Sequence, residues 1–237
     1  MLSSLPRRQV LISLLAVSAS GLALAACNDS EQAQAPAEQP APATPAAPAA
    51  QIPASSGNVD MAKLLEDGSL PDKVLGNADA PVTIVEYASM TCPHCATFHT
   101  QTLPVIKEKY IDTGKARLIM REFPFDPRAE AGFMLARCAD NNYFAMIDAL
   151  FRQQRGWATA ENASDALLQI ARMAGFSQES FTACLTNQKL LDDVRAVRTR
   201  GAETFGVDST PTFFINGKTY KGAMSVDEMS ALIESLT

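Results

Sequence analysis

The sequence predicts an α/β fold in which a βαβ unit and a ββα unit enclose a long helical insertion. Two strand patterns, at 81–89 and 116–123, lie on either side of a helical pattern. From 127 to about 205, apolar side chains then recur only at helical spacing. Strand patterns return at 212–221 and are followed by a last helix. The two halves of one sheet are therefore expected to lie far apart in sequence.

The βαβ unit begins with 81–89, whose sequence PVTIVEYAS is apolar on both alternating faces. Such a pattern is typical of a strand that is covered on both sides. The helix that follows starts near Pro93, and we expect Pro104 to kink it. Its inner stripe consists of Leu103, Ile106 and Tyr110.

The helical insertion carries recognisable helix ends. Ser164 and Ser177 are suited to N-cap positions, and Gly175 between them is suited to ending a helix. The apolar residues at helical spacing are Met134, Leu135 and Cys138 in one run and Phe144, Ile147, Leu150 and Phe151 in the next.

The ββα unit is signalled by a turn and a helix cap. Asn216-Gly217 predicts a type I′ hairpin between strands at 212–215 and 218–221. Ser225 and Glu228 form a capping-box pattern for the final helix. This order of elements predicts a thioredoxin-like fold whose core is split by an inserted helical domain.

The N-terminus has the layout of an export signal. Arg7 and Arg8 precede an uncharged stretch of small and aliphatic residues at 10–26, which is short for a membrane span. The alternative is a retained membrane anchor. The arginine pair also resembles a twin-arginine signal, although any signal has a basic start.

Cys27 follows Leu24-Ala25-Ala26, a pattern that resembles the lipobox of bacterial lipoproteins. We expect Cys27 to be lipidated, which would anchor the exported protein to a membrane. The alternative is ordinary cleavage after Ala25, which would leave Cys27 as a plain tail residue.

Residues 28–58 contain six prolines and ten alanines and almost no large apolar side chain. Such a segment cannot bury enough apolar surface to offset its ordering entropy, so it is interpreted as an extended tether. The expected organisation is signal 1–26, tether 27–58, first core part 59–126, helical insertion 127–206 and second core part 207–237.

The charge balance excludes one class of partner. The chain has 20 basic and 26 acidic residues, and loss of the signal removes two of the basic ones. An acidic protein without a basic cluster is a poor ligand for nucleic acid.

The sequence Cys92-Pro93-His94-Cys95 at the start of a helix carries the chemistry. Pro93 suits the first helical position, and free backbone N–H groups and the helix dipole would stabilise a thiolate at Cys92. His94 would add positive charge or a hydrogen bond. Cys95, one turn into the helix, would be the resolving thiol.

Other interpretations of this motif are open. A structural disulfide is one, although so short a ring constrains little of the unfolded chain. Cys92, Cys95 and His99 also have a metal-ligand spacing, but the chain has only two histidines and no second CxxC pair. Covalent haem attachment would need a histidine where Ala96 stands.

The CPHC motif, the preceding strand with Glu86-Tyr87, the helical insertion and the later Thr210-Pro211 together resemble the DsbA-like thiol-disulfide oxidoreductases. The resemblance covers residues 74–237. It implies a cis peptide bond before Pro211, beside the active-site disulfide. The backbone of Thr210 would then be free to pair with an extended substrate.

The resemblance also implies a role for Glu86, as an acid beneath the motif that accepts a proton from the resolving cysteine. The alternative is a glutamate in an ion pair at a strand edge. His99 is expected to be a packed helix residue.

The resemblance further implies a second disulfide in the insertion, between Cys138 and Cys184. The alternative is two buried free thiols.

The function expected from all of this is an exported, periplasmic thiol-disulfide oxidoreductase that oxidises cysteine pairs of other exported proteins. We expect a monomer without a cofactor or a metal, which a membrane redox partner reoxidises and which meets the membrane only through its lipid anchor. The alternatives are a disulfide isomerase, a reductase, or a metal-binding lipoprotein using Cys92, Cys95 and His99.

Overall fold

The structure, a computed structural model, describes residues 51–237. The predicted export signal, Cys27 and most of the predicted tether lie outside the described residues. No helix within 51–237 is long and apolar enough to span a membrane.

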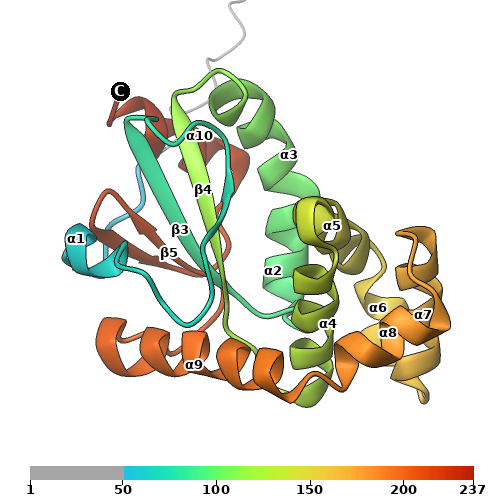
Figure 1. The fold of residues 1–237 in the computed structure, drawn as a ribbon. Coiled ribbons are helices and arrows are strands. Elements are labelled where there is room, and N and C mark those ends of the chain that lie inside the picture. Colours follow the sequence, from blue (N-terminus) through green and yellow to red (C-terminus); the bar gives the residue numbers. More distant parts are fainter. Residues whose placement is uncertain (1–50) are drawn as a thin grey trace, which may run out of the picture. The chain divides into compact units, whose positions relative to one another are not determined.

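One mixed sheet forms the centre of the fold (Figure 1). Its order is β1-β6-β5-β3-β4-β2. The strands are β1 (Gly57–Asn58), β2 (Lys73–Leu75), β3 (Val82–Ala88), β4 (Ala116–Glu122), β5 (Thr212–Ile215) and β6 (Lys218–Lys221).

Strand β3 is internal to the sheet, parallel to β4 and antiparallel to β5. All seven of its residues are buried, as the continuous apolar pattern predicts. Glu86 is paired in register with Phe213 on one side and Met120 on the other. The strand therefore delivers the chain to the active-site motif from the middle of the sheet.

Two helices follow β3 as one irregular rod. They are α2 (Pro93–Thr97) and α3 (Leu103–Ile106), and each is followed by a π-helical turn, η1 (Phe98–Thr102) and η2 (Lys107–Ile111). The irregularity expected at Pro104 takes this form, because the Leu103 N–H reaches back to the carbonyl of Phe98.

Opposite faces of the sheet are covered by different helices. The rod and α10 (Val226–Glu234) pack on one face through Phe98, Ile106 and Ile233. Helices α1 (Met61–Leu64) and α9 (Gln188–Phe205) supply apolar residues to the core on the other face. Gly201 in α9 permits this packing, since a Cβ there would lie 2.6 Å from the Tyr87 ring.

The insertion lies beside the rod and is entirely helical (Figure 1). Besides α9 it comprises α4 (Pro127–Cys138), the 3₁₀ turn η3 (Asp140–Asn142), α5 (Tyr143–Arg152), α6 (Gln154–Ala158), α7 (Ala163–Met173) and α8 (Gln178–Leu185).

Helix ends in the insertion follow the sequence signals with one error. Ser177 caps α8, and Gly175 follows α7 with a φ of +90°. The predicted N-cap Ser164 is wrong, because Asn162 caps α7 and accepts the N–H of Asp165 at 3.2 Å. Asparagine and serine cap about equally well, so the pattern alone did not decide between them.

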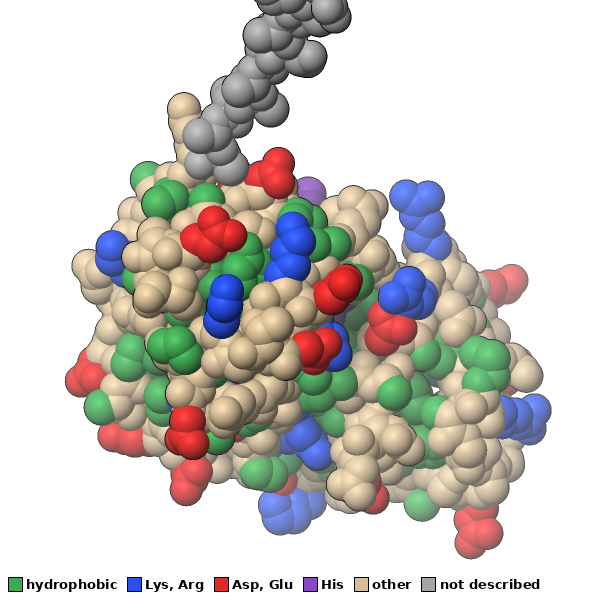
Figure 2. Space-filling model, turned by 90° about the horizontal axis from the view of Figure 1, so that it is seen from above, with side chains coloured by type: hydrophobic (Ala, Val, Ile, Leu, Met, Phe, Trp, Pro, Cys, Tyr) green, Lys and Arg blue, Asp and Glu red, His purple; other side chains and the backbone are tan. Residues whose placement is uncertain are grey.

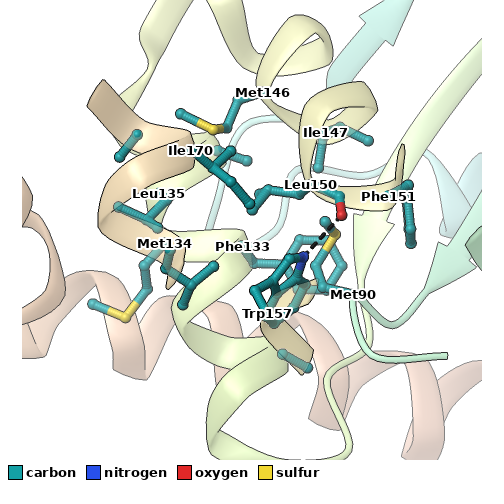
Figure 3. Packing of buried hydrophobic residues seen from close by; sticks show 14 of the residues in the cluster. Met90, Phe133, Met134, Leu135, Met146, Ile147, Leu150, Phe151, Trp157 and Ile170 are labelled. Atoms are coloured by element: carbon teal, nitrogen blue, oxygen red, sulfur yellow. Dashed lines mark hydrogen bonds between the residues drawn. The ribbon is translucent and has the colours of Figure 1, made fainter. Parts of the chain in front are cut away.

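Trp157 belongs to the buried apolar core of the insertion (Figure 3). It is fully buried, and its indole N–H donates to the carbonyl of Leu150 at 2.8 Å. Met90, from the loop before the CPHC motif, packs in the same cluster. Each large apolar side chain buried here contributes about 1.5–3 kcal/mol, so the insertion is bound firmly to the active-site loop.

The ββα unit follows its local signals. Asn216 and Gly217 both have positive φ, of 44° and 88°, as a type I′ turn requires. Ser225 and Glu228 form the reciprocal capping box at the start of α10.

The predicted boundary between tether and core needs a correction. Gly57 and Asn58 belong to the sheet as β1, paired antiparallel with β6, and the N–H of Ser56 donates to the carbonyl of Thr219 at 2.8 Å. These contacts are made by the backbone, so a composition poor in apolar side chains gave no sign of them.

Candidate active site

Cys92 and Cys95 differ sharply in exposure although three residues separate them. Cys92 is the N-cap of α2, in extended conformation, with Pro93 at the first helical position. Cys92 is partly exposed, whereas Cys95 is completely buried, and both are free thiols. A small part of the helix therefore presents one reactive sulfur and conceals the second.

The environment of Cys92 lowers its pKa from an ordinary value of 9.0 to about 5. The largest cause is a hydrogen bond from the Cys95 thiol, opposed in part by burial. The Thr210 hydroxyl and the backbone N–H groups of Cys95 and His94 lower it further. Cys92 is therefore a thiolate at neutral pH.

The environment of Cys95 acts in the opposite direction. Burial raises the pKa of its thiol well above 9.0, and the hydrogen bond to Cys92 and the charge of Glu86 add to the effect. At neutral pH the pair is thus one thiolate and one thiol, which is the reactive state of a dithiol exchange centre.

Thr210 and Pro211 lie against the exposed sulfur. The peptide bond between them is cis, and the Thr210 carbonyl lies 3.3 Å from the Cys92 Sγ, which donates to it when protonated. The buried Thr210 hydroxyl has no hydrogen-bond partner within the described residues, so it is free to donate to the thiolate.

Glu86 and His99 form a buried pair beneath the motif. The Nε2 of His99 lies 2.9 Å from the Oε2 of Glu86, and the His99 ring stacks on Phe151. Because β3 is internal, Glu86 does not lie at a strand edge. His99 is packed, as the sequence predicts, but its bond to Glu86 was not anticipated.

His94 is exposed, and its contribution to Cys92 comes from its backbone N–H. Residues 51–237 bring together no group of three or more side chains suited to hold a metal ion. The metal alternative on Cys92, Cys95 and His99 therefore has no preformed site in the described chain.

Comparison with known proteins places the chain in a family. The family described as Thioredoxin matches residues 69–235. The chain belongs to the thioredoxin family. Its relatives and structural neighbours make it a DsbA-like member: alpha-DsbA1 of Wolbachia pipientis is 34% identical, with a TM-score of 0.68 over 73% of this chain and 94% of that one.

Two relatives compared by sequence agree. A Bacillus anthracis relative named as a disulfide bond formation protein D is 31% identical over 60% of this chain and 69% of its own length. A Rickettsia conorii relative named as a protein-disulfide oxidoreductase is 36% identical over 69% of this chain. The match spans 59% of the rickettsial protein, about three fifths of its length.

In this DsbA-like protein, the insertion contributes directly to the active-site loop. The Gln154 amide donates to the carbonyls of Met90 and Cys92, at 2.9 Å each. Sequence reasoning missed Gln154, and no local pattern distinguishes it from the exposed Gln153 beside it.

Asp126 was missed as well, although a signal existed. Asp-Pro at 126–127 is a helix-start pattern, and Asp126 caps α4. Its other carboxylate oxygen accepts the hydroxyl proton of Thr91 at 2.6 Å, which ties the insertion to the residue before Cys92.

The insertion of this DsbA-like protein also contains a disulfide between Cys138 and Cys184, the pair that the family resemblance implied. It joins α4 to α8 across a sequence separation of 46 residues.

Proposed function

We propose that this DsbA-like protein is an exported oxidant that donates the Cys92–Cys95 disulfide to cysteine pairs of other exported proteins. A substrate thiolate attacks the Sγ of Cys92, forms a mixed disulfide and breaks the bond to Cys95, which takes up a proton. The second substrate thiolate then attacks the first substrate sulfur and releases Cys92 as a thiolate. A membrane redox partner would accept the two electrons and restore the disulfide.

One observation carries this direction of reaction. The pKa of Cys92 is lowered to about 5, and the thiolate exists only when the pair is reduced. Whatever stabilises the reduced form makes the disulfide more oxidising. An isomerase or a reductase shares this sulfur chemistry, and the reduction potential distinguishes the three.

The remaining predicted site residues have supporting roles in this proposal. Pro93 starts the helix that presents Cys92, and His94 contributes its backbone N–H. Glu86 accepts or returns the proton of Cys95. The backbone of Thr210, next to Pro211, pairs with an extended substrate segment by strand addition.

The test uses oxidised protein and a reduced, unfolded secreted protein whose folding requires its disulfides. Mass spectrometry should show stoichiometric disulfide formation in the substrate, and the Cys92→Ser variant should form none. The reduction potential, measured against glutathione, should lie well above the value of about −270 mV that is typical of thioredoxin. A potential at or below the thioredoxin value contradicts the oxidant and favours a reductase.

We also propose that the protein is periplasmic and monomeric, and that a lipid on Cys27 anchors it through the 27–58 tether. Cys27→Ser should move the protein from the membrane fraction to the soluble periplasmic fraction. Mass spectrometry of the wild type should find the lipid, and an unmodified, soluble wild type contradicts the anchor.

A further inference from the structure

His99 is a buried histidine that the proposed exchange reaction does not yet use. It lies in the π-helical turn η1, four residues after Cys95, with only 3% of its side chain exposed. It makes two interactions of different kinds, a hydrogen bond to Glu86 and a stack on Phe151 with ring centroids 4.3 Å apart.

The Cys95 thiol has no contact with solvent, so its proton cannot pass directly to water. Cys95 and Glu86 are both completely buried, and Glu86 lies in the middle strand of the sheet. The Oε1 of Glu86 has no hydrogen-bond partner in the described residues, whereas its Oε2 is bound to His99. One oxygen is thus unpartnered on a carboxylate whose charge acts on the Cys95 thiol, and the other is bound to the histidine.

His99 borders a cavity of about 350 Å³ between the α2–η2 rod and α5. The apolar part of the lining includes Leu103, Pro104 and Ile147. Three charged residues, Lys107, Asp148 and Arg152, also line it, and their side chains are about half exposed to solvent. Since one water occupies about 30 Å³, the cavity has room for water beside the imidazole.

We propose that His99 is a positioning residue for Glu86 that passes the proton of Cys95 between Glu86 and water in this cavity. The inference rests on the proposed function, because it assigns the proton route of the same thiol pair. An imidazole can take a proton at one ring nitrogen and release it from the other, and Nδ1 has no partner within the described residues.

On reoxidation, the partner protein is first bound to Cys92 through a mixed disulfide. Cys95 loses its proton to Oε1 of Glu86, and its thiolate attacks Cys92 in the mixed disulfide, which releases the partner sulfur as a thiolate. Glu86 is then neutral, and the imidazolium of His99, whose Nε2–H donates to Oε2, releases its Nδ1 proton to cavity water, so that one proton leaves Cys95 and one reaches water. Reduction of the pair runs the same transfers in reverse. The charged and titratable groups around His99 are Glu86 on β3, Cys95 on α2, Lys107 on η2, and Asp148 and Arg152 on α5.

The test isolates the step that depends on Cys95. Reduced protein is converted to a mixed disulfide between Cys92 and 5-thio-2-nitrobenzoate, and release of the coloured thiol is followed by stopped flow from pH 5 to 9. His99→Gln keeps a hydrogen-bonding group beside Glu86 but cannot carry a proton. It should release the thiol about tenfold more slowly at pH 7. The difference should narrow toward pH 9, because a higher hydroxide concentration makes removal of the proton depend less on the imidazole.

A second variant tests the cavity itself. In His99→Ala, added imidazole should restore the release rate in proportion to its concentration. The same imidazole should leave the wild type and Glu86→Gln unchanged, because the first has its own relay and the second has lost the acceptor.

The outcomes that overturn the relay are distinct. Equal pH profiles for His99→Gln and wild type overturn it, and so does a loss that is equal at every pH and accompanied by a changed Cys92 titration at 240 nm. The assay needs no protein substrate, so a relay that passes this test alongside a protein that fails to oxidise substrates would contradict the proposed function alone.

Discussion

At the scale of single residues, the site depends on two identical side chains that acquire opposite properties. The CPHC motif at a helix start predicts the activated Cys92, and the backbone N–H groups of His94 and Cys95 do contribute. The largest contribution, however, is the hydrogen bond from Cys95, which a motif does not rank above the helix dipole. The buried thiol therefore tunes its exposed neighbour as well as resolving the mixed disulfide.

This ranking makes a prediction about Cys95. Cys95→Ala should raise the pKa of Cys92 from about 5 toward 9.0, because the main hydrogen-bond donor to the thiolate is lost. Cys95→Ser keeps a hydroxyl donor and should raise it much less. Thiolate absorbance at 240 nm, followed against pH, measures both. Identical titrations of Cys95→Ala and wild type would show that the donor is unimportant.

Some of the residues around the cysteines could be predicted from local sequence patterns, and others could not. The importance of Glu86 could be predicted from the sequence, because a carboxylate in an otherwise apolar strand is costly to bury without a partner or a function. The hydrogen bond between His99 and Glu86 could not be predicted, because the π-helical turn η1 alters the spacing that helical periodicity assumes. The role of Gln154 could not be predicted from the sequence, because its two hydrogen-bond partners lie 64 and 62 residues away along the chain.

At the scale of elements, the strands and the hairpin followed from local signals. The bounds of β5 and β6 agree with the sequence pattern because Asn216-Gly217 fixes the turn between them. The short helices of the insertion were less predictable, since several capping residues compete near Asn162. The insertion also holds the active-site loop through Gln154 and Asp126, so its stability bears on the chemistry.

Gln154 provides a test of this coupling. Gln154→Leu should lower the free energy of unfolding by about 1–3 kcal/mol, because the buried Met90 carbonyl loses its donor. The Cys92 carbonyl keeps the Ala96 N–H at 3.1 Å. Urea unfolding of the reduced protein measures the change. The exposed neighbour serves as control, since Gln153→Leu should stay within about 0.5 kcal/mol of wild type. Equal stability of both variants would contradict the coupling.

The disulfide of the insertion provides another test. The Cys138–Cys184 bond closes a sequence separation of 46 residues, and in the loop-entropy account its loss costs up to about 4 kcal/mol. Changing both residues to serine should lower the urea midpoint without abolishing thiol exchange at Cys92. Unchanged stability would show that the unfolded chain gains little freedom from the cut. Loss of thiol exchange at urea concentrations where the variant is still folded would show that the insertion determines the geometry of the active site.

At the scale of the whole molecule, a catalytic domain spanning 57–237 follows a segment that lies mostly outside the described residues. The long-range pairing of β1 with β6 is a contact of backbone to backbone over about 160 residues, which explains why composition placed the tether boundary too late. The arrangement leaves one reactive sulfur partly exposed and its partner buried, so the redox state of that pair should govern the stability of the entire fold.

The free energy of unfolding should depend on both the redox state and the pH. The reduced active site holds a thiolate and a thiol where the oxidised one holds a disulfide, and the folded state lowers the pKa of Cys92 from 9.0 to about 5. A folded pKa below the unfolded one stabilises the fold fully above the unfolded value. The stabilisation fades as pH falls from about 9 and is lost below about 5. The oxidised form has no thiolate to titrate here.

The reduced protein should therefore unfold at a higher urea concentration than the oxidised protein at pH 7.5, and the difference between their midpoints should shrink steadily down to pH 4. Paired urea titrations at several pH values measure it, and every other titrating group largely cancels between the two redox forms. The Cys92→Ser variant cannot form the active-site disulfide, so its urea midpoint should not depend on added oxidant. If the oxidised form is the more stable one at pH 7.5, the folded state favours the disulfide, which makes it a poor donor. A reductase would then fit the molecule better, because thiolate stabilisation at Cys92 would be outweighed by strain or burial elsewhere in the reduced fold.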